Sequence, residues 1–108
     1  MRLGIQPPSV RKHYSQMIWD MIDTTVTGFG FRWFFRKVSD SIESESYLIY
    51  VSNDFQSVFK FYVEFRDRGI LIKNIGGPVG NRNRVSIQLN NIDLTDFSNY
   101  LCDNLVGV

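Results

Sequence analysis

The chain has 108 residues, a formal net charge of +1 and one cysteine, and it predicts a single α+β domain over residues 1–108. A chain of this length can bury a core without metals or disulfides, and a lone Cys102 excludes an internal disulfide and fits a reducing compartment. The small net charge commits the chain neither to nucleic acid nor to a membrane surface, so electrostatic recognition has to come from a local patch.

The N-terminal part predicts an extended arm and then a helix. Two consecutive prolines end the arm, residues 1–8, and disfavour helical backbone before them. Ser9 is a good N-cap, and apolar residues at helical spacing predict a helix from about Val10 to Val26, ended by Gly28. Trp19 is expected on the polar side of this helix. It either packs against a loop or the arm, or anchors a partner, as exposed tryptophans often do.

The central segment Val58–Arg66 carries the clearest pattern in the chain. Phenylalanine and valine occupy its odd positions from residue 59, whereas most even positions are polar, which is typical of a strand with one dry face. Weaker alternation around it predicts four further strands, and the five expected strands are residues 29–38, 47–51, 58–66, 70–75 and 85–89.

The connections between these strands are read from turn-forming residues. An acidic stretch over residues 39–46 predicts an exposed loop, and a glycine-rich stretch over residues 76–84 predicts a flexible hairpin loop. Gly69 closes a tight turn after Asp67 and Arg68 and is expected to supply a positive φ there.

The C-terminal segment predicts a second helix. Asp93 is a good N-cap, and Leu94, Phe97, Leu101 and Leu105 form one apolar stripe, so the helix should run to about Leu105. A helix, five strands with short connections and a helix favour an antiparallel meander with both helices on one face. The expected fold is therefore a two-layer α+β sandwich.

That fold leaves the other face of the sheet open. This face should carry three aromatic residues and five cations against one carboxylate, interleaved with aliphatic residues: Arg32, Phe34, Arg36, Leu48, Tyr50, Val58, Lys60, Tyr62, Glu64, Arg66, Leu71, Lys73, Ser86 and Gln88. Arg82 and Arg84 could extend the basic strip from the glycine-rich loop. The candidate partner-binding residues are Trp19, Arg32, Phe34, Arg36, Tyr50, Lys60, Tyr62, Arg66, Lys73, Arg82 and Arg84.

Three uses of this face are open at the level of sequence. Aromatic, arginine and aliphatic side chains together suit a protein partner or a second copy of the chain. Aromatic rings between cations also suit single-stranded nucleic acid, because bases stack on rings and cations follow phosphates. Cross-strand pairing of the cations with the rings would instead leave the face without a partner. The expected function is a non-enzymatic protein-binding module, with single-stranded nucleic acid as the alternative.

Catalytic, metal-binding and cofactor-binding residues are not predicted. His13 and Cys102 could meet if the helices lie side by side, but both border an apolar stripe, where a structural role is commoner. The glycines of residues 76–80 lack the lysine and hydroxyl residue that end a phosphate-binding loop. An enzyme with an unfamiliar site remains a second alternative.

The sequence also suggests where the protein works. The N-terminus lacks the apolar stretch of a signal peptide, and no apolar run approaches the roughly 20 residues of a membrane span, so a cytoplasmic location without a membrane partner is expected. The chain contains no alanine but much isoleucine, asparagine and phenylalanine. An AT-rich coding sequence of this kind would suit a phage or mobile-element protein acting as an accessory, immunity or inhibitor factor.

Overall fold

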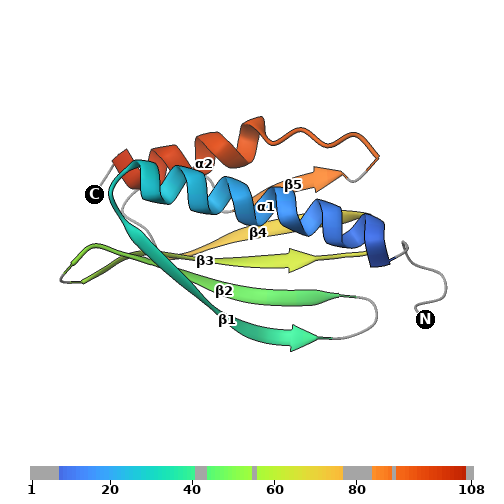
Figure 1. Ribbon diagram of the computed structural model, residues 1–108, viewed down its shortest axis with the longest axis horizontal. Coiled ribbons are helices and arrows are strands. Elements are labelled where there is room, and N and C mark those ends of the chain that lie inside the picture. The colour runs from blue at the N-terminus through green and yellow to red at the C-terminus, as the bar shows by residue number, and fades with distance from the viewer. Residues whose placement is uncertain (1–7, 41–43, 55, 77–83, 89, 107–108) are drawn as a thin grey trace.

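Both helices lie on one side of an antiparallel sheet (Figure 1). The computed structural model describes residues 8–40, 44–54, 56–76, 84–88 and 90–106. Its elements in chain order are α1 (Pro8–Gly28), β1 (Arg32–Asp40), β2 (Glu45–Ser52), β3 (Ser57–Phe65), β4 (Gly69–Gly76), β5 (Arg84–Gln88) and α2 (Thr95–Val106). The predicted α+β fold, with a five-stranded meander between two helices, is confirmed.

The sheet has the strand order β1-β2-β3-β4-β5, and every neighbouring pair is antiparallel. The segment with the clearest alternation, β3, is therefore the central strand, and β1 and β5 form the two edges. The helix-side residues of β3 are paired in register with apolar residues of β2, as Phe61 lies opposite Ile49 and Phe59 lies opposite Val51. Each strand thus adds its apolar positions to the same face.

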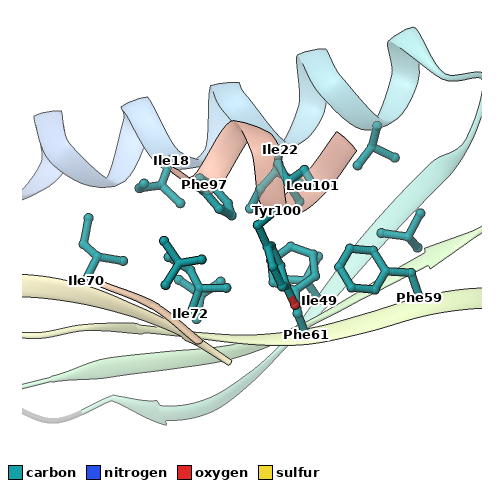
Figure 2. Close-up of a cluster of buried hydrophobic side chains, with 14 of the residues drawn as sticks. Ile18, Ile22, Ile49, Phe59, Phe61, Ile70, Ile72, Phe97, Tyr100 and Leu101 are labelled. Atoms are coloured by element: carbon teal, nitrogen blue, oxygen red, sulfur yellow. The ribbon is translucent and has the colours of Figure 1, made fainter. Parts of the chain in front are cut away.

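The core fills the space between this face and the helices (Figure 2). α1 contributes Ile18, Ile22 and Val26, all of which are fully buried. From α2, the Tyr100 ring contacts two rings of β3, with centroid distances of 5.6 Å to Phe59 and 6.0 Å to Phe61. Burial raises the pKa of the Tyr100 phenol above its ordinary value, so this side chain stays neutral in the core.

The end of α1 differs from the sequence expectation. Phe31 N–H donates to the Val26 carbonyl at 3.1 Å, and Gly30 N–H donates to the Thr27 carbonyl at 2.9 Å, the two bonds of a Schellman motif. Gly30 has the positive φ, 85°, that this motif requires, so it, and not Gly28, is the terminating glycine. The expected strand from residue 29 is wrong at its start, because this helix end uses residues 29–31.

The start of α1 also differs. Pro8 belongs to the helix and not to the expected arm, which agrees with the tolerance of a first helical turn for proline. The rest of the expected arm, residues 1–7, lies outside the described part of the chain. At the start of α2 the Asp93 carboxylate accepts the Thr95 N–H at 2.9 Å, which confirms Asp93 as a capping residue.

Trp19 occupies a different position from the one its helical spacing predicts. Its half-buried ring lies against four rings on the helix side of the sheet, at centroid distances of 5.1 Å to Tyr47, 5.4 Å to Phe35 and 5.8 Å to both Trp33 and Phe65. Trp33 Nε1 also donates to Asp23 Oδ1 at 2.9 Å, which ties β1 to α1. The large ring of Trp19 thus reaches the sheet although its position is beside the apolar stripe of α1.

Gly69 is required for a reason that the sequence does not reveal. It begins β4 without a positive φ, so the expected turn conformation is wrong. A Cβ at Gly69 would lie 2.7 Å from the Ile87 carbonyl oxygen on β5, closer than any ordinary contact. The absence of a side chain allows β4 and β5 to pair closely at this end.

We expect Gly69→Ala to lower the free energy of unfolding by about 1–3 kcal/mol, because the β5 backbone has to move away from the new methyl group. The melting temperature should fall by several degrees. Gly28→Ala is the matched control, since a Cβ there meets nothing within 4 Å and its φ is not positive. Equal stabilities of the two variants would contradict the close approach of β5.

Candidate interaction face

The sheet face turned away from the helices is called the open face below. On β3 the residues Phe59, Phe61, Val63 and Phe65 are buried on the helix side, so the alternate positions point to the open face. The strand register then sets two rows across the sheet. The first row is Phe34, Tyr50 and Lys60, and the second is Arg36, Leu48, Tyr62, Lys73 and Arg84.

The first row contains a stacked aromatic pair. The rings of Phe34 and Tyr50 lie 4.9 Å apart with an interplanar angle of 10°. The Lys60 ammonium group lies 5.9 Å from the centroid of the Tyr50 ring, within range of a cation–π contact. Phe34 remains 58% exposed although it is a large apolar residue, which makes it the most exposed aromatic side chain described on this face.

Tyr62 of the second row belongs to a hydrogen-bonded group with Glu64 and Arg66. The Tyr62 hydroxyl donates to Glu64 Oε1 at 2.6 Å, and Arg66 Nε donates to Glu64 Oε2. The hydrogen bond from Tyr62 and the nearby Arg66 charge lower the pKa of Glu64. Burial, and the bond to this carboxylate, raise the pKa of Tyr62. Tyr62 therefore stays a phenol, and the Glu64 charge is shared with two donors.

The cations of the open face are poorly balanced. Lys73 on β4 lies directly opposite Arg84 on β5, and like charges in such a pair are destabilising. Among the described strand residues of this face, Glu64 is the only carboxylate, and it is held by Tyr62 and Arg66. Arg32 pairs with Asp54 at 3.6 Å, but both side chains are highly exposed and such a pair contributes little.

The structure brings most of the predicted partner-binding residues to one surface. Phe34, Arg36, Tyr50, Lys60, Tyr62, Lys73 and Arg84 lie in the two rows, with Arg32 at one end and Arg66 just beyond β3. Trp19 lies on the helix side of the sheet and cannot share a flat contact with them. Arg82 lies outside the described residues.

Two features of this face were missed by the sequence reasoning. Leu71 is only 5% exposed and Ser46 only 2%, although both belong to the open face. They flank Glu64 in the register, Ser46 on β2 and Leu71 on β4. Their burial shows that neighbouring side chains cover this part of the sheet. The covered part is limited to the strands beside Glu64, because Ser86 and Gln88 on β5 remain exposed on the same face.

Within the described residues, no group of three or more histidine, cysteine, aspartate or glutamate side chains could hold a metal ion. Neither described helix combines the length and the apolar character needed to cross a membrane. The side chain of Cys102 is a half-buried free thiol, and the side chain of His13 lies outside the described part of the chain.

Comparison with protein-family models and with curated proteins gives no match.

We expect Tyr62→Phe to raise the pKa of Glu64 towards its ordinary value, since the carboxylate loses the donor that lowers this pKa most. A lowered pKa stabilises the folded state above the pKa of the unfolded chain, and this stabilisation is lost as the pH falls through the folded value. The variant should therefore be less stable by about 1 kcal/mol at neutral pH, and the difference should shrink in acid.

The Glu64 titration can be followed by NMR of its side-chain carboxyl carbon, and stability by denaturant unfolding at several pH values. Tyr50→Phe is the control, because the Tyr50 ring contacts Phe34 and Lys60, and the donors to Glu64 are Tyr62 and Arg66. An unchanged Glu64 titration in Tyr62→Phe would show that this hydrogen bond does not hold the carboxylate in its charged form.

Proposed function

We propose that the protein is a non-enzymatic binding module whose open face docks on an acidic surface of a protein partner. The exposed Phe34–Tyr50 stack is the observation that carries this proposal. It offers a rigid aromatic anchor, because each ring restricts the other. Aromatic residues and arginine are enriched in the cores of protein interfaces, and a few such residues supply most of the binding energy.

The charges around the stack indicate the chemistry of the partner. Arg36 is two residues from Phe34 on the same face, Lys60 contacts the Tyr50 ring, and Lys73 lies opposite Arg84. A partner with carboxylates around an apolar centre would relieve the repulsion between these cations and fill the surface over the stack. Complementary charge of this kind also speeds encounter and excludes basic partners.

Single-stranded nucleic acid is the second candidate, and the cation row Arg36, Lys73 and Arg84 favours it. The ring geometry favours it less. Phe34 stacks on Tyr50 and Lys60 lies over the Tyr50 ring, so a base could stack on Tyr50 only after displacing a neighbour. A protein partner can use the ring edges as they stand. The protein-binding module proposed here would act as an accessory, immunity or inhibitor protein.

A peptide library rich in aspartate, glutamate and aromatic residues, displayed against the immobilised protein, tests the proposal. We expect selected peptides to bind the wild type and to lose about 30-fold in affinity, or about 2 kcal/mol, with Phe34→Ala. Arg36→Glu should weaken them by reversing a charge that faces the acidic residues. Val106→Ala is the control, because Val106 is also an exposed apolar residue but lies on α2.

A labelled single-stranded oligonucleotide, measured by fluorescence anisotropy at low and high salt, separates the two candidates. The protein-partner proposal predicts no salt-sensitive binding. Binding that falls with salt by a slope near −0.7 per neutralised phosphate, and that weakens in Tyr62→Ala, would support nucleic acid instead. Peptides that bind wild type, Phe34→Ala and Arg36→Glu equally would remove the open face from the interaction.

A further inference from the structure

The free edge of β1 carries exposed apolar side chains between its cations. β1 pairs with β2 on one side, and none of the described strands pairs with its other side. Phe35 is 54% exposed on the helix side, Phe34 is exposed on the open face, and Val38 is 50% exposed. An unpaired strand edge with aromatic residues on both faces is a template for adding another strand, and proteins usually cover or charge such edges.

The regular part of this edge is short and well defined. Lys37 lies opposite Tyr47, but Ser39 lies opposite Ser46, so β1 has one extra residue at Val38. Such a bulge interrupts pairing and bends the strand. A further strand can therefore pair regularly only with residues Arg32–Lys37.

We propose that this edge of β1 pairs antiparallel with β1 of a second copy of the chain, which joins the two sheets into one. Antiparallel pairing of identical strands places a twofold axis perpendicular to the sheet. The axis keeps the helices of both copies on the same face of the joined sheet. Residues that lie opposite each other across the axis must then belong to the same face.

The charges of β1 select one register. Two registers with this symmetry pair five residues of the regular segment. Centring the axis on Phe34 would place Arg32 opposite Arg36 of the second copy on both sides of the axis, a repulsive pair. Centring it on Phe35 instead places Phe34 opposite Arg36 of the second copy and Trp33 opposite Lys37 of the second copy. Every aromatic residue except Phe35 then meets a cation, and Phe35 meets itself.

This self-complementarity is the reason to assign the edge to a second copy. An aromatic residue opposite an arginine or lysine gains a cation–π contact, and two opposed phenylalanines bury each other's exposed rings. A basic strand of another protein would bring further cations opposite Arg36 and Lys37. Here β1 of the second copy places aromatic rings opposite these two residues instead. The inference goes beyond the proposed function, since it assigns the strand edge to a second copy. It shares Phe34 and Arg36 with the open-face contact but leaves Tyr62 and Lys73 uncovered.

Sedimentation equilibrium over a range of concentrations, with the full chain, provides the first test. We expect the wild type to form a reversible dimer. Phe35→Lys should weaken the dimer at least about tenfold, because it places two ammonium groups at the axis. Val106→Lys, which adds the same charge at an exposed apolar site on α2, should leave the dimer unchanged. Circular dichroism of each variant verifies that the monomer is folded.

Cysteine cross-linking tests the register, in a Cys102→Ser background that removes the native thiol. Directly opposite residues in an antiparallel pair have Cβ atoms about 4.5–5.5 Å apart, close to disulfide distance. Phe35→Cys should therefore form a disulfide-linked dimer on mild oxidation. Phe34→Cys alone should not, but a mixture of Phe34→Cys with Arg36→Cys should cross-link.

Several results would overturn the inference. A wild type that stays monomeric at every concentration removes the dimer. A dimer that is insensitive to Phe35→Lys and does not cross-link through Phe35→Cys uses another surface. Efficient self-linking of Phe34→Cys in place of Phe35→Cys rejects the assigned register. Because these readouts need no peptide ligand, their failure is distinguishable from failure of the proposed open-face binding.

Discussion

Burial of the β3 phenylalanines beneath both helices is the constraint on which the rest of the structure depends. Phe59 and Phe61 contact Tyr100 of α2, and this contact fixes which side of the central strand is dry. Since successive strand residues point to opposite faces, the other positions of β3 are committed to the open face. Antiparallel register then carries the same division outward to both edges of the sheet.

The helix layer does not cover the sheet evenly. α2 contacts β5 and α1 contacts β1, yet β1 is the outermost strand in Figure 1 and lies beyond the helices for part of its length. Trp19 covers part of this region, and Phe35 beside it stays more than half exposed. Apolar exposure at the β1 side follows from having two helices for five strands. The bulge at Val38 limits how much of that edge can pair.

The predictable part of the fold came from local patterns. Alternation in β3 and the cap at Asp93 each depend on residues close in sequence, and both were found correctly. Alternating aromatics at residues 29–31 also resembled a strand pattern. The N–H groups of these residues instead donate hydrogen bonds to carbonyls at the end of α1. Gly69 could not be understood locally, because the group that excludes a side chain there is the Ile87 carbonyl on another strand.

The candidate site was predictable as a set of residues but not as a surface. The alternation of residues along each strand identified its members. The burial of Leu71 depends on neighbouring strands, where Glu64 lies directly opposite it, and alternation does not reveal it. The same is true of the Tyr50 ring, whose stacking on Phe34 depends on the pairing of β1 with β2. Rotamers and cross-strand contacts therefore decide which rings are available, and sequence spacing alone does not specify them.

The position of the aromatic anchor links the two proposed associations. Phe34 lies on the edge strand, so pairing of β1 with a second copy would bring two Phe34–Tyr50 stacks together on one continuous open face. Both copies would present their cations in the same direction, because the twofold axis is perpendicular to the sheet. A partner with two acidic sites at matching spacing would then engage both copies, and the second contact would form at a high effective concentration. Modest affinity at one open face is sufficient for tight binding by such a dimer.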